Sequence, residues 1–168
     1  EAALNIVNGA ISENRKVLIF SQFTSVLKKL GGELSSKSIG YLYLDGSTKA
    51  NKRVKMVKEF NESEDLKIFL ISLKAGGTGL NLTSSDLVLH FDPWWNPAIE
   101  DQATDRAHRI GQQNIVEVIK LIAKDSVEEN IIRLQEDKRE LINKVISGEE
   151  IGSNVIGKLS RDEIIDLF

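Results

Sequence analysis

Apolar residues along the chain gather into five short runs that are separated by longer amphipathic stretches. Each run is rich in β-branched or aromatic residues and is bounded by polar residues or glycine, as strands usually are. The runs cover residues 17–20, 41–44, 68–71, 87–91 and 116–122. Helical patterns lie between them at residues 24–34, 49–61 and 97–110. Continuous apolar strands that alternate with helices predict an α/β fold, with a parallel sheet covered by helices on both faces.

Two of the helix starts carry capping signals. Asn96 directly precedes Pro97, which suits a first helical turn, and Gly111 offers a stop for the same helix. Ser126 and Glu129 have the spacing of a capping box, which predicts a long helix from there to about Ser147. One face of this long helix is apolar and contains Val127, Ile131, Leu134, Leu141 and Val145.

The composition narrows the class of protein. The chain has 168 residues, which predicts a single domain. It has no cysteine and only two histidines, His90 and His108, so disulfides and thiolate metal sites are excluded and we expect no metal site. No apolar run is long enough to span a membrane, and the first residues lack the basic start of a signal peptide. We therefore expect an intracellular protein that has no membrane partner.

The charges are unevenly distributed along the chain. The net charge is −3, from 25 acidic and 22 basic side chains. Residues 148–168 carry five acidic and two basic side chains, so this tail accounts for the whole net charge and residues 1–147 are neutral. Residues 49–58 contain five basic side chains and no acidic one. That run is either a nucleic-acid-binding patch or the solvated face of a helix.

Three segments in the middle of the chain could carry chemistry. On a helix over residues 97–110, Gln102, Arg106 and Arg109 would share one face and could grip phosphate oxygens. The alternative is a solvated face. Three glycines among residues 76–79 either let the backbone approach a ligand or form a tight turn. Trp94 and Trp95 either anchor their loop in the core or offer a stacking surface to a partner.

A phosphate-cradling loop is missing from this sequence. The nearest match covers residues 152–158, but Leu159 stands where the motif needs a hydroxyl, and the segment follows a helix rather than a strand. If the domain takes part in nucleotide chemistry, we expect the primary phosphate site to lie elsewhere.

Five segments, taken in order, resemble successive motifs of the second RecA-like lobe of Swi/Snf-type ATP-dependent DNA translocases, a group of superfamily-two helicases. The resemblance covers about residues 15–147 and rests most on the Asp-Pro-Trp-Trp-Asn-Pro and Asp-Arg-Ala-His-Arg-Ile-Gly-Gln sequences, which are highly specific to this family. It implies a RecA-like lobe over residues 1–125, which begins with a helix at 2–11, and a bracing helix over 126–147. We expect residues 148–168 to form an acidic tail with a short helix. The five segments are residues 16–24, 44–47, 72–82, 92–97 and 105–112.

The resemblance also implies roles for individual residues. Arg106 and Arg109 correspond to arginine fingers, which act on ATP bound to the opposite lobe. The implied nucleotide-cleft residues are Gln102, Gly77, Gly79 and Asn81. The implied contacts with the DNA backbone are Ser21, Gln22, Gly46, Ser47, Arg53, Ser72, Lys74 and Thr78. We add Trp94 and Trp95 to the DNA-binding candidates, since their loop could stack against DNA, and it could equally contact a protein.

The family's ATP-binding lysine and acidic metal-binding box belong to a first lobe that this sequence lacks. The resemblance therefore implies that ATP and Mg²⁺ are held mainly by the missing N-terminal RecA-like lobe. We expect the chain to be half of a motor on double-stranded DNA, part of a DNA-dependent ATPase in the full-length protein and inactive as an ATPase alone. A non-catalytic module that binds nucleic acid or protein is the alternative. Composition favours a bacterial nucleoid over a nucleus as the location.

Overall fold

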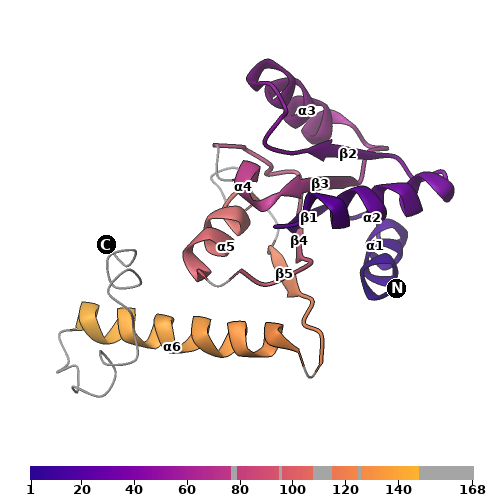
Figure 1. Cartoon of the computed structure of the whole chain (residues 1–168). Helices are drawn as coiled ribbons and strands as arrows, with labels where there is room; N and C mark the ends of the chain where they lie inside the picture. The colour runs from indigo at the N-terminus through magenta and orange to yellow at the C-terminus, as the bar shows by residue number, and fades with distance from the viewer. Residues whose placement is uncertain (77–78, 95, 108–114, 125, 148–168) are drawn as a thin grey trace.

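Five parallel strands form a single sheet in the order β2-β3-β1-β4-β5 (Figure 1). The computed structural model describes residues 1–76, 79–94, 96–107, 115–124 and 126–147, and the side chains of the last helix as far as Glu140. The strands are β1 (Val17–Ser21), β2 (Tyr41–Leu44), β3 (Ile68–Ser72), β4 (Leu87–His90) and β5 (Glu117–Lys120). The helices are α1 (Ala2–Ser12), α2 (Thr24–Ser36), α3 (Ala50–Glu62), α4 (Leu73–Gly76), α5 (Pro97–Thr104) and α6 (Val127–Ser147).

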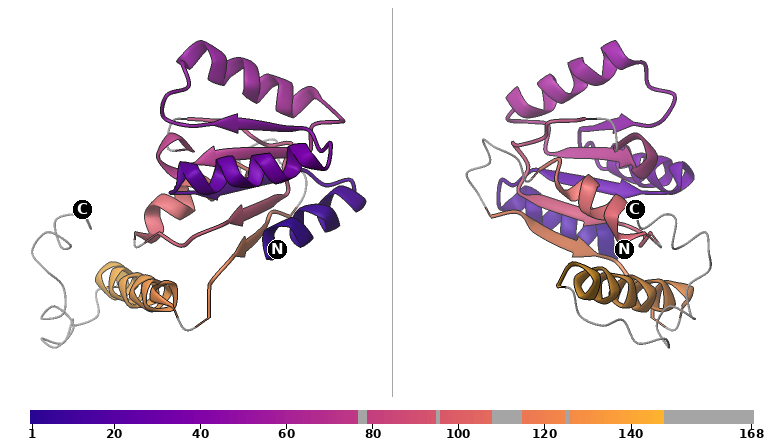
Figure 2. Two further views of the ribbon diagram at one scale, coloured as in Figure 1. Left: turned by 45° about the vertical axis from the view of Figure 1, so that its right-hand side comes forward. Right: turned by 90° about the vertical axis from the view of Figure 1, so that its left-hand side faces the viewer.

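The three central strands are buried on both faces, as their continuous apolar sequences predict. Alternate residues of each strand point to opposite faces. One face packs against α1 and α2, through a core that includes Ile19, Leu70 and Leu89. The other packs against α3, α4 and α5, through a core that includes Phe20 and Phe69. The layers can be followed in Figure 2. The prediction of an α/β parallel sheet covered on both faces is confirmed.

Strand β5 differs from its prediction. The apolar run over residues 116–122 was expected to be buried, but β5 is an edge strand that pairs only with β4. Glu117 and Val118 are exposed, and Ile119 and Lys120 are partly buried. An apolar run alone does not distinguish a central strand from an edge strand, because burial depends on what lies on each side of it.

Helix α6 lies beyond the β5 edge of the sheet, beneath α5, and extends past both (Figure 1). Its start follows the predicted capping signal in part. The Ser126 hydroxyl accepts a hydrogen bond from the backbone N–H of Glu128 at 3.1 Å, and the carboxylate that reaches back is that of Glu128, not Glu129, to the N–H of Ala123. The predicted tail over residues 148–168 lies outside the described residues, and the domain boundaries stay a prediction.

A close contact between α2 and β2 gives a first testable prediction. A Cβ added to Gly31 would lie 2.6 Å from the Tyr41 hydroxyl oxygen, whereas one added to the adjacent Gly32 has nothing within 4 Å. Both Gly→Ala changes gain up to about 1 kcal/mol of helix stability, but only Gly31→Ala must displace the Tyr41 ring, which costs about 1–3 kcal/mol. In urea denaturation we expect Gly32→Ala to be the more stable of the two. Equal midpoints would mean that the ring moves aside without cost.

Candidate functional site

The carboxyl ends of β1, β3 and β4 lie side by side at one edge of the sheet. Ser21 at the end of β1 pairs in register with Ser72 at the end of β3, and Phe20 pairs with His90 at the end of β4. Because all strands are parallel, the segments that follow them meet at this edge. In open α/β sheets, ligands bind outside this edge.

Asp92 connects the ends of β1 and β4. Its carboxylate accepts hydrogen bonds from the Ser21 hydroxyl and, at 3.0 Å, from the backbone N–H of Gln22. Burial raises the pKa of Asp92, and these hydrogen bonds oppose the rise. The Gln22 side chain donates to the Pro93 carbonyl at 3.4 Å. Ser21 and Ser72 are both buried, so of the predicted phosphate contacts at this edge that the structure describes, Gln22 and Lys74 are the ones that reach the surface.

Arg53 shapes the loop between β2 and α3. Its guanidinium donates to the carbonyls of Thr48 at 2.8 Å and of Asp45 and Gly46 at 3.3 Å each. Within the same loop, the Asp45 carboxylate accepts from the N–H and the hydroxyl of Ser47, which holds the pKa of Asp45 below its usual range. Gly46 and Ser47 are exposed. Arg53 therefore fixes the backbone that presents these two residues to solvent.

A groove of about 520 Å³ lies between α3 and residues 79–81, which follow α4. Gly79 borders it with a positive φ of 55°, a conformation that favours glycine. Asn81 lies next to it and its carbonyl accepts from the Asn61 side chain on α3 at 2.8 Å. The structure thus brings Arg53, a predicted DNA contact, to the same groove as two predicted nucleotide-cleft residues. The lining residues are Thr48, Ala50, Arg53, Val54, Val57, Gly79, Leu80 and Asn81.

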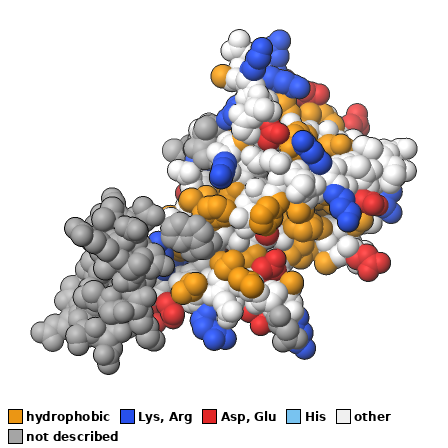
Figure 3. Space-filling model, in the orientation of Figure 1, with side chains coloured by type: hydrophobic (Ala, Val, Ile, Leu, Met, Phe, Trp, Pro, Cys, Tyr) orange, Lys and Arg blue, Asp and Glu red, His pale blue; other side chains and the backbone are white. Residues whose placement is uncertain are grey.

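Basic side chains cover the outer side of α3. Lys49, Lys52, Lys55 and Lys58 are all exposed, and Lys58 lies 3.9 Å from Glu62. Figure 3 shows Lys and Arg side chains gathered over this helix. Both interpretations of residues 49–58, a nucleic-acid-binding patch and a solvated helix face, predict this exposure. Of the five basic residues in this run, Arg53 lines the groove and the four lysines do not.

The predicted helix over residues 97–110 is confirmed for residues 97–104 and wrong for residues 105–107, while residues 108–110 lie outside the described residues. The Asn96 cap is confirmed, since its side chain accepts from the N–H of Ala98 at 3.2 Å, but α5 ends at Thr104. The Arg106 carbonyl accepts from the N–H of Leu82 at 2.9 Å, and Ala107 is buried in the core, so tertiary contacts draw these residues off the helix axis. Gln102 is exposed whereas Arg106 is only 5% exposed. The two side chains therefore do not share an exposed helix face.

The Leu82–Arg106 hydrogen bond brings several of the predicted site residues close together. It places Arg106 next to the segment that contains Gly79 and Asn81, so three of the predicted nucleotide residues come from adjacent segments. Arg109, Gly77, Thr78 and Trp95 lie outside the described residues.

Trp94 is partly buried and packs against the core on the α3–α5 face of the sheet. This placement favours the core-anchor interpretation for Trp94 over a freely exposed stacking surface. Its backbone is held by Glu100 and Gln135, which the sequence analysis did not single out. Asp92 was also missed as a site residue, although it begins the Asp-Pro-Trp-Trp-Asn-Pro sequence that signalled the loop.

A model of the helicase conserved C-terminal domain matches residues 1–111. The chain belongs to this family. An uncharacterized ATP-dependent helicase of Mycoplasma pneumoniae is 41% identical over 168 residues, 100% of this chain and 16% of that protein. The DNA repair protein RAD5B of Arabidopsis thaliana is 46% identical over 138 residues, and the aligned region covers 82% of this chain and 11% of that protein. The C-terminal part of the Fun30 ATPase domain superposes with a TM-score of 0.76 at 36% identity, covering 98% of this chain and 50% of that one.

These similarities confirm the resemblance that the motifs indicated. The chain is the C-terminal lobe of a Swi/Snf-related superfamily-two helicase, with a RecA-like α/β fold. This helicase lobe spans 14–16% of the length of the first three relatives. None of the helices within the described residues combines the length and apolar character needed to cross a membrane.

Proposed function

We propose that this lobe is the second half of an ATP-driven motor that moves along double-stranded DNA. The observations that carry the proposal are the groove between α3 and residues 79–81, which Arg53 lines, and the exposed lysines at residues 49, 52, 55 and 58. Lysines that neutralise phosphates bind DNA without reading its sequence, which suits a protein that moves along the duplex. Relatives named as helicases and DNA repair proteins support this choice over a protein-binding module.

Residues from three segments supply the DNA contacts in this proposal. Gly46 and Ser47 present their loop to the phosphate backbone, and Arg53 holds that loop in place. Gln22 and the exposed Lys74 extend the surface along the carboxyl edge of the sheet. Ser21 and Ser72 support this edge from beneath, because both are buried.

The nucleotide is held mainly by an N-terminal RecA-like lobe, which also binds Mg²⁺ in this proposal. Closure of the two lobes brings Arg106 and Arg109 toward the transferring phosphoryl group, with Gln102, Gly79 and Asn81 at the rim of the cleft. Because Arg106 is buried in the isolated lobe, closure must also re-aim its side chain. The lobe alone therefore does not hydrolyse ATP. A location where DNA is present, the nucleoid or the nucleus, follows from the same proposal.

DNA binding by the 168-residue chain tests the basic surface of α3 directly. We expect the double variant Lys52→Ala/Lys55→Ala to bind a labelled duplex about tenfold more weakly in anisotropy titrations, and the slope of log affinity against log salt to fall by about 2. The matched control is Lys29→Ala/Lys37→Ala, which removes two exposed lysines of the α2 region. Equal losses in both variants would show that only total charge matters, and tight, salt-insensitive binding would contradict DNA binding through the lysines of α3.

A further inference from the structure

The backbone of Trp94 is held from two sides by buried polar side chains. Its N–H donates to the Glu100 carboxylate of α5 at 2.6 Å, and its carbonyl accepts from the Gln135 amide of α6. Glu100 is 1% exposed and Gln135 is 2% exposed. Two elements that are far apart in the sequence therefore meet on one residue of the loop over 92–96.

Lys120 of β5 closes this arrangement into a ring. Its ammonium pairs with the second oxygen of Glu100 and donates to the Gln135 side-chain oxygen at 3.1 Å. Both oxygens of Glu100 and both polar atoms of Gln135 are thus used, as buried polar groups require. The charge of Glu100 is balanced at the same place. We call Glu100, Lys120 and Gln135 the polar cluster.

Within its described side chains, which end at Glu140, helix α6 makes several polar contacts with the lobe. Neither of the two core clusters includes an α6 side chain among the described residues. Val127 and Leu134, on the predicted apolar face, are 73% and 55% exposed. Besides the polar cluster, Arg139 pairs with Asp101 of α5 at 2.6 Å, at a largely exposed position where an ion pair contributes little. Gln135, which is buried on α6, therefore links the docking of this helix to Trp94.

We infer that Glu100, Lys120 and Gln135 are positioning residues that couple the docking of α6 to the backbone position of Trp94. When α6 is docked, Gln135 holds the Trp94 carbonyl and Lys120 orients Glu100 toward the Trp94 N–H. When α6 leaves, the Trp94 carbonyl loses its partner and Glu100 keeps Lys120 and the Trp94 N–H, so Trp94 loses one of the two side chains that hold its backbone. If the proposed motor function holds, this coupling makes the DNA-facing edge of the lobe sensitive to the position of α6.

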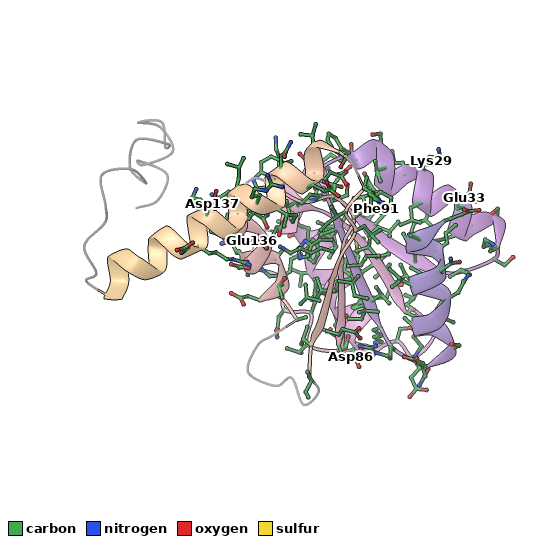
Figure 4. The ribbon with its side chains drawn as sticks, turned by 90° about the horizontal axis from the view of Figure 1, so that it is seen from below. Lys29, Glu33, Asp86, Phe91, Glu136 and Asp137 are labelled. Carbon is green, nitrogen blue, oxygen red and sulfur yellow. The ribbon has the colours of Figure 1, made fainter. Side chains whose placement is uncertain are left out.

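Tryptophan fluorescence reads this loop selectively, because Trp94 and Trp95 are the two tryptophans of the chain. We expect Gln135→Ala to shift the emission to longer wavelength and to increase its quenching by acrylamide. The matched control is Glu136→Ala, at the adjacent exposed position of α6, which is labelled in Figure 4. Its emission should equal that of the unchanged chain. A folded Gln135→Ala chain with unaltered emission and quenching would overturn the inference.

The effect of Glu100 on the docking of α6 gives a second measurement, which does not depend on the Gln135→Ala variant. Coupling is reciprocal, so Glu100→Gln on α5 should loosen α6, which Glu100 reaches through Lys120 and through the backbone of Trp94. We expect amide hydrogen exchange in residues 131–139 to be about tenfold faster in that variant, as for the loss of a charge-assisted hydrogen bond. Unchanged exchange in α6 would reject the coupling. Neither measurement uses DNA or ATP, so failure here is distinct from failure of the motor function.

Discussion

Replacing Arg106 by alanine is expected to lower kcat for ATP hydrolysis by about 10³-fold or more, in a protein that carries this lobe together with its first motor lobe. A guanidinium placed against the transferring phosphoryl group stabilises charge that develops only in the transition state, which is worth roughly 10³–10⁵ in rate. KM for ATP should change little, since the first lobe binds the nucleotide. The measurement is steady-state hydrolysis with saturating double-stranded DNA.

Two further variants separate this role from a structural one. Arg106→Lys keeps the positive charge but loses the planar fork, so we expect an intermediate kcat. Arg133→Ala removes an exposed arginine of α6 and should leave kcat unchanged. Because Arg106 is buried, the alanine variant must also keep its unfolding midpoint and its DNA affinity. Full hydrolysis by a folded Arg106→Ala protein would rule out the arginine-finger assignment.

Acidification from about pH 7 to pH 4 is expected to cost the lobe about 3 kcal/mol of stability through His90 alone. His90 stacks on Phe20 at 5.7 Å between ring centroids, and its Nε2 lies 3.1 Å from the Thr104 hydroxyl. The pKa of His90 is lowered to about 4, chiefly by burial, with Lys120 adding to the shift and Glu100 and Asp101 partly opposing it. Between pH 6.5 and about 4, the unfolded chain therefore binds a proton at this residue that the folded lobe does not. The free energy of unfolding therefore decreases as the pH falls from 6.5 to about 4.

The variant His90→Gln isolates this effect, because glutamine does not titrate and can still reach the Thr104 hydroxyl. We expect the difference in unfolding free energy between the unchanged chain and the variant to shrink by about 3 kcal/mol as the pH falls, in denaturant titrations at several pH values. The raised pKa of Asp92 acts in the opposite sense, and it cancels because both chains contain it. Parallel pH profiles for the two chains would contradict the prediction.

The sequence predicts the strands well because each lies in an environment that its residues alone describe. The runs over 17–20, 41–44 and 68–71 match β1, β2 and β3 to within one residue. A strand that is buried on both faces has a continuous run of apolar residues, and this run is visible in the sequence without knowledge of the rest of the fold. The cap at Asn96 is likewise local, since it depends on residues two positions apart.

The features that sequence reasoning missed depend on partners far along the chain. Residues 105–107 leave the helix because the backbone N–H of Leu82 donates to the Arg106 carbonyl. No periodicity of the residues around 106 can indicate this distant partner. The polar cluster is a similar case, because Glu100 and Gln135 look like solvated helix residues until β5 places Lys120 between them. The order of the motifs predicts the edge at which the site forms, but not which of its side chains are buried.

The strand order also governs how the lobe can fold while it is being synthesised. Central strand β1 ends at Ser21 but pairs with β3 and β4, which begin at Ile68 and Leu87, and β2 pairs only with β3. No strand can therefore gain its first partner until β3 has left the ribosome. Pairing between distant segments slows folding, and the apolar residues of β1 stay unprotected in the meantime. A newly made lobe of this kind should therefore depend on chaperones more than a helical protein of equal length.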